Sequence, residues 1–337
     1  MPTKYKSRRW RHGDASAFAM SEIKRAAGLL RAGELVAFPT ETVYGLGADA
    51  ANPQAVAKIF AAKGRPQDHP LIVHLADAGQ FDAWARDIPA AARLLAATFW
   101  PGPLTLILRR QPVVSDAITG GQDTIGLRVP NHPMALELLR EFGGGLAAPS
   151  ANRFGRISPT MAQHVRDELG ESIAMVLDGG PCQVGIESTI LDLSGDVPAI
   201  LRPGTVTAAA IAAVLGQEPA VGLAPGGDTP RVSGSLESHY APRTPLELVS
   251  SDGLVFAVRN AIIRRERTAF LASMAQPIHH ELIEWRLAPT EPGPFARSLY
   301  ASLRELDDLG CDRLVVQAPP ATAGWTATLD RLRRAAG

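Results

Sequence analysis

The sequence predicts an α/β protein of two units joined by a stretch rich in proline and glycine. Apolar runs of strand length alternate with segments whose apolar residues recur at helical spacing, and 337 residues suffice for two domains. Over 218–243 the alternation stops, because prolines and glycines leave no room for a helix or central strand. We therefore expect one unit over 1–217, a linker or lid over 218–243, and a smaller α/β unit over 244–337.

The first unit opens with a helix that leads into a strand. Residues 17–31 repeat apolar side chains at helical spacing, and Gly33 suits the end of that helix. The strand Leu35–Phe38 follows, and a loop over 39–47, rich in glycine and hydroxyl groups, leads to a helix over 53–62. Such loops bind ligands in α/β folds, although the threonines would equally satisfy the backbone of a turn.

Two cations stand one residue apart after this helix. Lys63 and Arg65 flank Gly64, and Pro66 and Pro70 restrict the loop, so both side chains can converge on one anion. We expect them on an exposed loop. The alternative is a solvated basic loop without a ligand.

The strand Leu71–Leu75 carries His74 among aliphatic residues. Such a histidine is either a hydrogen-bonded core residue or a group that contacts a ligand. Helices near 78–86 and 90–99 and the strand Leu104–Leu108 follow. No G-x-x-x-x-G-K-[ST] loop occurs, so a nucleotide would be held by other loops and side chains.

Arg128 lies near the end of a strand with one apolar face. Alternation over 124–129 puts Thr124, Gly126 and Arg128 on the other face, and a helix over 132–142 follows. Arginine suits the two-pronged recognition of a carboxylate, although a surface arginine paired with an acid fits equally.

Polar side chains also follow the remaining strands of this unit. Ser150 and Asn152 come after a short apolar strand, and Ser158 suits the N-cap of the next helix. Further strands are expected near 174–178, 188–193 and 199–201. Arg202 follows the last of them. Polar groups at five separate strand ends or turns indicate one shared site.

The second unit shows no site-like cluster. Strands are expected at Leu246–Val249, Leu254–Val258, Thr268–Leu271 and Arg313–Val316, and helices at 295–309 and 326–335. The linker before it contains His239 and Tyr240, an imidazole beside an amphipathic ring that a flexible tether would not need.

Composition restricts the class of function. Lys plus Arg and Asp plus Glu each number 34, so no net field would hold a polyanion, and any nucleic-acid contact must be local. Cys182 and Cys311 show no metal-ligand spacing, which fits a reducing compartment. With no targeting segment and no run of about 18 apolar residues, we expect a cytoplasmic protein without membrane contact.

Five motifs occur in a recognisable order: Phe38–Leu46, Lys63–Arg65 with Pro70–Leu71, Pro149–Asn152, Glu187–Thr189 and Arg202–Gly204. With them the whole chain resembles the long form of the threonylcarbamoyl-AMP synthases. The resemblance implies a YrdC-like catalytic domain with a twisted mixed sheet, a Pro/Gly-rich ordered linker, and a smaller Rossmann-like C-terminal domain. It implies a nucleotidyltransferase that joins L-threonine, bicarbonate or CO2, and ATP into L-threonylcarbamoyl-adenylate and pyrophosphate. That is the first step of threonylcarbamoyl-adenosine formation at position 37 of tRNA.

The resemblance also implies roles for individual residues. The signature tetrad of the family falls on Lys63, Arg65, Ser150 and Asn152. The L-threonine pocket falls on Thr42, His74, Arg128, the backbone of Ala148, and Ser188. The ATP contacts fall on Arg65, His69, Thr124, Ser150, Ser158, Arg202 and Tyr240. The chain departs from the family at His69, usually Asn, and at Val232–Gly234, usually Ala or Ser followed by Pro and Gly.

The implied partners follow from the reaction. Mg²⁺ is expected on the triphosphate with no ligand from the protein, and the product passes to tRNA threonylcarbamoyl-transferase proteins, with at most a weak local contact to tRNA. Two alternatives stay open: an RNA-binding module of the same fold, and a related carbamoyl-adenylate-forming enzyme with another acceptor. The neutral net charge disfavours the first, and the threonine-type pocket residues disfavour the second.

Overall fold

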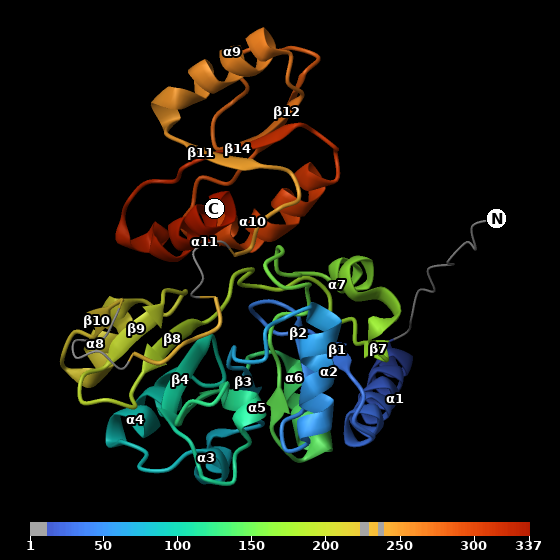
Figure 1. Ribbon diagram of the computed structural model, residues 1–337, viewed down its shortest axis with the longest axis vertical. Coiled ribbons are helices and arrows are strands. Elements are labelled where there is room, and N and C mark those ends of the chain that lie inside the picture. Colours follow the sequence, from blue (N-terminus) through green and yellow to red (C-terminus); the bar gives the residue numbers. More distant parts are fainter. Residues whose placement is uncertain (1–11, 223–228, 235–238) are drawn as a thin grey trace.

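The computed structural model describes residues 12–222, 229–234 and 239–337, which form two β-sheets with flanking helices (Figure 1). The first sheet has the strand order β10-β9-β8-β4-β5-β3-β6-β2-β1-β7. Its strands are β1 Val36–Phe38, β2 Gly45–Asp49, β3 Ile72–His74, β4 Leu104–Arg109, β5 Thr124–Arg128, β6 Leu146–Ala147, β7 Met175–Val176, β8 Thr189–Asp192, β9 Ala199–Arg202 and β10 Ala220–Val221.

Helices cover this sheet, and its strands run in both directions. The helices are α1 His12–Arg31, α2 Pro53–Lys63, α3 Phe81–Trp84, α4 Ala90–Phe99, α5 Asp116–Thr119, α6 Pro133–Phe142, α7 Ala162–Leu169 and α8 Ala208–Leu215. Neighbours β3 and β5 are parallel, whereas β4 and β5 are antiparallel. The expected α/β fold with a twisted mixed sheet is confirmed. None of the described helices is long and apolar enough to cross a membrane.

The central strands bring two predicted site residues together. The register of β3 and β5 sets His74 directly beside Arg128, and β6 pairs with β3 on its other side. The segment that follows β6, with Ala148 and Ser150, therefore starts next to the same strand ends.

Helix α2 ends at the two cations. The Asn52 side chain accepts from the first N–H groups of the helix, and Gly64, with φ 61°, ends it in the left-handed conformation. The side chain of Lys63 is buried at 3% exposure, and Nζ donates to the carbonyl oxygens of Ser150 and Asn152. Arg65 is 7% exposed. The expectation of an exposed loop is wrong, because the helix end turns both side chains inward.

Two other local expectations also need correction. Residues 45–49, expected within or after a loop, form strand β2, which pairs antiparallel with β1. Helix α7 begins at Ala162 rather than beside Ser158, whose hydroxyl donates to a carboxylate oxygen of Glu187 at 2.6 Å. Ser158 is therefore a buried partner of Glu187 and not an N-cap.

The second unit is a parallel sheet between helices. Its strands, in the order β11-β14-β12-β13, are β11 Leu246–Val249, β14 Arg313–Gln317, β12 Thr268–Ala272 and β13 Ile283–Leu287. Helix α9 Leu254–Arg264 packs against one face, and α10 Pro292–Asp307 and α11 Thr326–Ala336 pack against the other.

The strand expected at Leu254–Val258 is wrong, because these residues begin helix α9. Burial there follows a helical period: Leu254 and Val258 are buried, whereas Phe256 is 67% exposed. A short apolar run does not by itself distinguish a strand from a helix.

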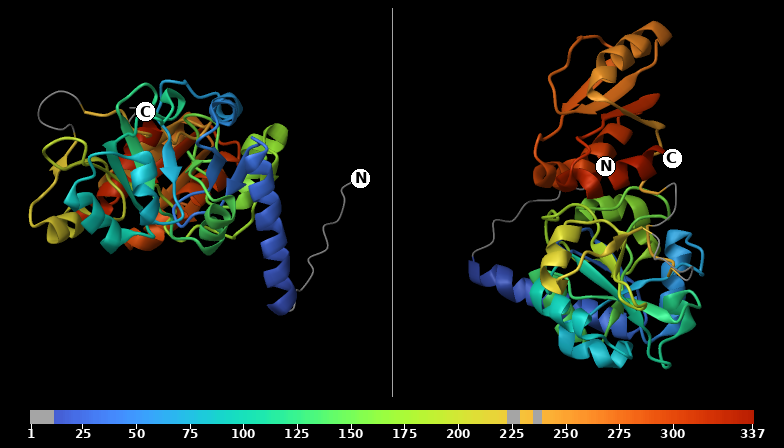
Figure 2. Two further views of the ribbon diagram at one scale, coloured as in Figure 1. Left: turned by 90° about the horizontal axis from the view of Figure 1, so that it is seen from below. Right: turned by 90° about the vertical axis from the view of Figure 1, so that its left-hand side faces the viewer.

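The two units pack against each other through α10 and α11, which lie between the second sheet and the first unit (Figures 1 and 2). One apolar cluster crosses the junction. It includes Val43, Ile157 and Ile186 of the first unit together with Leu299 and Leu303 of α10. The junction is therefore a packed core that can hold a site residue in a fixed position.

The contacts of Lys63 yield a stability prediction. In Lys63→Ala the two buried carbonyls lose their donor, so the free energy of unfolding should fall by about 1–3 kcal/mol. Lys58→Ala, on the exposed side of the same helix, removes a surface ion pair to Glu34 and should change it by less than about 1 kcal/mol. Denaturant unfolding measures both. Equal effects would show that the contacts of Lys63 contribute nothing.

Candidate active site

A cavity opens where the ends of strands from the first sheet meet the linker. It is lined by Thr40, Thr42, Val43, Gly45, Ile72, His74, Arg128, Ala148, Pro149, Ser150, Glu187, Ser188, Arg202, Ser233, His239 and Tyr240. All five residues of the predicted threonine pocket are among them, together with three of the predicted ATP contacts: Ser150, Arg202 and Tyr240. The structure thus brings together residues that are up to 198 positions apart in sequence, from Thr42 to Tyr240.

Arg128 lines this cavity and is paired with Glu41. Arg128 Nη2 lies 2.6 Å from Glu41 Oε1, and both side chains are almost fully buried. Arg128 Nε donates to the carbonyl of Gly102, and Glu41 Oε2 accepts from the N–H of Asn131. The Arg128–Glu41 contact is close but lacks hydrogen-bond alignment. Glu41 was not predicted, although it lies inside the quoted motif next to Thr42.

His74 stands beside Arg128 with spare hydrogen-bonding capacity. The ring is 3% exposed, and Nδ1 has no hydrogen-bond partner among the described residues. Burial and then the charge of Arg128 lower the pKa of His74 well below its ordinary value. The imidazole is therefore neutral and can pair with a hydroxyl group.

Arg202 also lines the cavity. Its Nε and Nη2 donate to the carbonyl and hydroxyl of Ser188, and Nη1 donates to the carbonyl of Ser233 in the linker. The hydroxyl of Ser188 is also 2.8 Å from that of Thr105. The guanidinium is thus held by neutral acceptors, and its charge stays available to an anion.

Of the signature tetrad, Ser150 lines this cavity, and Lys63 holds the loop that carries it. Lys63 donates to the backbone of the loop that carries Ser150 and Asn152, whose amide in turn donates to the carbonyls of Arg153 and Arg156. Burial and then the charge of Arg65 lower the pKa of Lys63. Lys63 thus holds the shape of this loop.

Arg65 extends this group towards the linker. Nη2 donates to the carbonyl of Pro70, the guanidinium lies 5.9 Å from the ring centroid of Phe154, and burial lowers the pKa of Arg65 to about 10. His69 and His239 meet the same ring edge-on, at 5.3 and 5.9 Å between centroids. Phe154 thus links the basic segment to the linker, a role that no sequence motif indicated.

Thr124 is one of the predicted residues that do not line the main cavity. It lines a neighbouring small pocket with Gln122, Arg231 and Val232. Ile72 and Ser233 line both cavities, so the pocket that contains Thr124 is adjacent to the main cavity.

Tyr240 covers the cavity from the linker side. It is 1% exposed with φ 66°, and its hydroxyl has no hydrogen-bond partner among the described residues. Gly234 lies so close that a Cβ there would be 2.2 Å from Tyr240 Oη. Parts of the predicted lid, 223–228 and 235–238, lie outside the described residues.

Glu187 connects the cavity to the second unit. Its carboxylate accepts from Ser158, from the Tyr300 hydroxyl at 2.9 Å, and from Arg331 Nε at 2.7 Å. Burial would raise the pKa of Glu187, but the charges of Arg331 and Arg202 lower it to about 2. The expectation of no site-like cluster in the second unit is wrong. Arg331 was missed because it is 144 residues away from Glu187.

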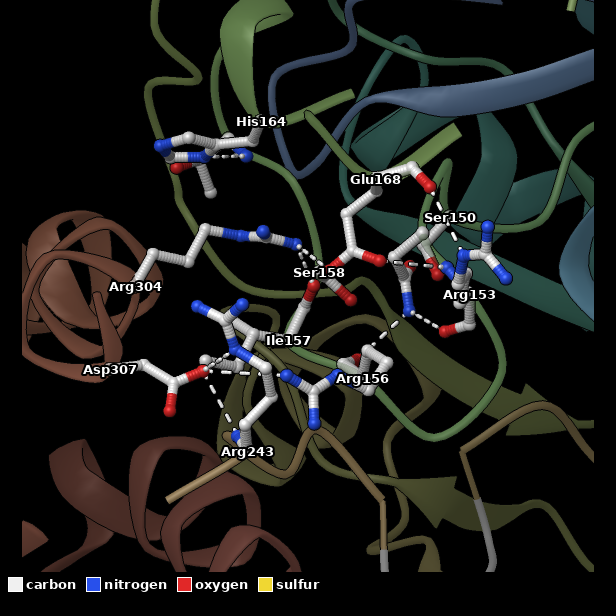
Figure 3. A network of polar contacts seen from close by, with 12 residues as sticks. Ser150, Arg153, Arg156, Ile157, Ser158, His164, Glu168, Arg243, Arg304 and Asp307 are labelled. Carbon is white, nitrogen blue, oxygen red and sulfur yellow. Dashed lines mark hydrogen bonds and ion pairs between the residues drawn. The ribbon is translucent and has the colours of Figure 1, made fainter. Parts of the chain in front are cut away.

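A separate polar network holds the segment after Asn152 against the second unit (Figure 3). Asp307 of α10 accepts from the N–H groups of Arg243 and Thr244 and pairs with Arg156 at 3.3 Å. Arg304 pairs with Glu168 and donates to the carbonyl of Ile157. These contacts between α10 and the first unit hold the two units together.

Comparison with known proteins agrees with this arrangement. A family model described as Telomere recombination (Sua5_yciO_yrdC) matches residues 28–204, and one described as Threonylcarbamoyl-AMP synthase, C-terminal domain, matches 206–337. A Bacillus subtilis protein named Threonylcarbamoyl-AMP synthase is 41% identical, over 94% of this chain and 93% of its own length. The chain belongs to the threonylcarbamoyl-AMP synthase family.

Other members of the threonylcarbamoyl-AMP synthase family match along nearly the whole chain. The Pyrococcus abyssi member is 39% identical, over 94% of each chain. The crystal structure of P. abyssi Sua5 complexed with L-threonine superimposes with a TM-score of 0.87 at 38% identity, covering 94% of both chains. The resemblance inferred from the five motifs is confirmed.

The lowered pKa of Glu187 yields a prediction about acid stability. In the unfolded chain this carboxyl takes up its proton near pH 4.5, and in the folded protein only near pH 2. Between these values the unfolded state binds the extra proton, so the stabilising contribution is complete above about pH 4.5 and is lost as pH falls to about 2. Glu187→Gln should remove this part of the pH dependence. Parallel urea titrations at pH 6 and pH 3 measure it, and an unchanged difference between them would contradict the assignment.

Proposed function

We propose that this protein forms L-threonylcarbamoyl-adenylate and pyrophosphate from L-threonine, bicarbonate or CO2, and ATP, as the first step of threonylcarbamoyl-adenosine formation in tRNA. The observation that carries the proposal is a single cavity that brings together a carboxylate-type group, Arg128 with His74, and a phosphate-type group, Arg202. Relatives that match this chain along nearly its whole length are named threonylcarbamoyl-AMP synthase.

On the threonine side, Arg128 would hold the α-carboxylate and His74 the side-chain hydroxyl. The free Nδ1 of His74 supports the second contact. The hydroxyls of Thr42 and Ser188 would face the amino acid. The N–H of Ala148 already donates to the carbonyl of Ile72, so its carbonyl would accept from the amino group.

On the ATP side, Arg202 and Arg65 would meet the phosphates. The remaining contacts we propose are His69, Thr124, Ser150, Ser158 and Tyr240. Among these, Ser158 already donates its hydroxyl proton to Glu187. Towards ATP, the Ser158 oxygen would therefore act as a hydrogen-bond acceptor. Asn152 and Lys63 would keep the loop with Ser150 in place.

Mg²⁺ would be carried by the substrate. The described part of the chain contains no group of three His, Cys, Asp or Glu side chains that could hold a metal ion.

The charges of the site fit a reaction in which two anions meet. The neutral threonine amino group first bonds to the carbon of CO2 and loses a proton to form a carbamate; if bicarbonate enters, a C–O bond of bicarbonate breaks and water leaves. A carbamate oxygen then attacks the α-phosphorus of ATP while the bond to the pyrophosphate breaks. Repulsion between these anions opposes the second step, and Arg202 and Arg65 would lower that cost. Nucleotidyl transfer depends mainly on positioning and charge, so no protein nucleophile is required.

The product is a mixed anhydride, which a transferase acting on tRNA must take over. We propose that downstream tRNA threonylcarbamoyl-transferase proteins consume it, and that this chain makes at most a weak local contact with tRNA because its formal net charge is zero.

Substrate dependence tests the proposal. Pyrophosphate release from ATP in the presence of bicarbonate should be stimulated by L-threonine, weakly by L-serine, and not by L-valine. Serine lacks one methyl group, worth about 1–3 kcal/mol, whereas valine leaves His74 without a hydroxyl partner. A protein that releases pyrophosphate equally with and without threonine does not have this function.

The role of Arg128 is tested by a conservative change. Arg128→Lys keeps the charge but loses the planar fork, so the KM for threonine should rise about tenfold or more while the KM for ATP changes little. Arg109→Lys on the neighbouring strand β4 is the control, because that side chain is 48% exposed and pairs with Asp123. Unchanged threonine KM in Arg128→Lys would place the carboxylate elsewhere.

A further inference from the structure

Helix α11 of the second unit sends a guanidinium into the wall of the cavity. Arg331 is completely buried; Nε donates to Glu187 Oε2 at 2.7 Å and Nη2 to the carbonyl of Pro203 at 3.0 Å. The third nitrogen, Nη1, pairs with Asp330. Because each nitrogen has a partner, the side chain has one well-defined position.

The same guanidinium also holds the linker. Its Cζ lies 5.4 Å from the ring centroid of Tyr240, and the ring of Tyr300 stacks on Tyr240 at 5.8 Å. Tyr240 is thus held between groups of α10 and α11, the two helices that face the first unit. The left-handed backbone of Tyr240, unusual for a residue with a side chain, shows that tertiary contacts determine this position.

We propose that Arg331 is a positioning residue for ATP, which fixes the nucleotide-contacting groups through Glu187 and Tyr240; this rests on the function proposed above. Three of the proposed ATP contacts interact with Arg331 or with its partner Glu187. Ser158 donates to Glu187, Arg202 lies in its field, and Tyr240 lies under Arg331.

The threonine wall does not depend on Arg331. Arg128 is paired with Glu41, and His74 is held in strand β3 beside it. Ser188 lies next to Glu187 in sequence and accepts from Arg202, but its hydroxyl is also held by Thr105 of strand β4. The two substrates should therefore respond differently to the loss of Arg331.

A purely structural role makes a different prediction. If Arg331 only fastened the two units, its loss would lower the amount of folded enzyme and hence the apparent kcat, while both KM values stayed unchanged. A positioning role raises the KM for ATP in the protein that remains folded.

The decisive experiment measures steady-state kinetics of pyrophosphate release for the full-length Arg331→Gln variant. We expect the KM for ATP to rise about tenfold and the KM for threonine to stay within about twofold. Two controls share features of Arg331. Arg333→Gln removes an exposed charge from the same helix, and Arg297→Gln removes a contact across the junction to the carbonyl of Gln183. Both should leave the two KM values unchanged.

Two milder variants keep the test decisive if Arg331→Gln does not fold. Arg331→Lys keeps the charge without the fork, and Tyr300→Phe removes one donor to Glu187 without changing charge. Both should raise the KM for ATP by a few-fold and leave that for threonine unchanged. If both KM values stay at the wild-type level in these variants, or if Arg297→Gln raises the KM for ATP as much as Arg331→Gln does, the proposal is overturned.

Direct binding separates this proposal from the proposed function. Calorimetric titration with ATP should give weaker binding in Arg331→Gln than in wild type and in Arg333→Gln. This comparison decides the role of Arg331 even if wild-type protein releases no pyrophosphate with threonine, in which case only the function fails. Equal ATP affinity in all three proteins would refute the role of Arg331 alone.

Discussion

The burial of cations determines how this site is built. Lys63, Arg65, Arg128, Arg202 and Arg331 are all less than 9% exposed, and each must replace its lost water by other partners. In the described part of the chain three carboxylates pair with these cations: Glu41 with Arg128, and Glu187 and Asp330 with Arg331. Backbone carbonyls supply most of the other partners. This choice stabilises the cations without neutralising them, so the site keeps a positive charge for an anionic substrate.

Two of these carboxylates, Glu41 and Glu187, support different parts of the site. Glu41 stands with Arg128 on the wall assigned to the amino acid, and Glu187 stands with Arg331 on the wall assigned to the nucleotide. A carboxylate paired with an arginine in each wall fixes the direction of that guanidinium, and hydrogen bonds from Asn131 and Ser158 fix the carboxylates in turn. The position of each substrate group thus depends on a buried pair that the substrate itself need not touch.

Sequence could predict the strands and the segments that lie at their ends, because strand periodicity and punctuation by Gly and Pro are local signals. The family resemblance also assigned Thr42, His74, Arg128 and Ser188 to one pocket, and these four residues line one cavity. Sequence could not predict what lies opposite them. Lys63 was expected on an exposed loop but is buried, because its Nζ donates to the carbonyls of Ser150 and Asn152. These residues are 87 and 89 positions away in the sequence. Arg331 carries no local signal of its role, since Glu187 and Pro203, which it contacts, belong to the other unit. Leu254–Val258 is too short for its period to be recognised.

The linker shows how a departure from the family pattern can be compatible with the site. The proline expected before Gly234 is replaced by Ser233, whose carbonyl accepts from Arg202, and Val232 packs against Ile107 and Ile190. These contacts restrict the backbone conformation of the linker, which a proline would otherwise restrict. Gly234 remains, with φ 82°, and a Cβ there would collide with the hydroxyl of Tyr240. The glycine is therefore the part of the pattern that the position of Tyr240 requires, whereas the proline can be replaced by packing and one hydrogen bond.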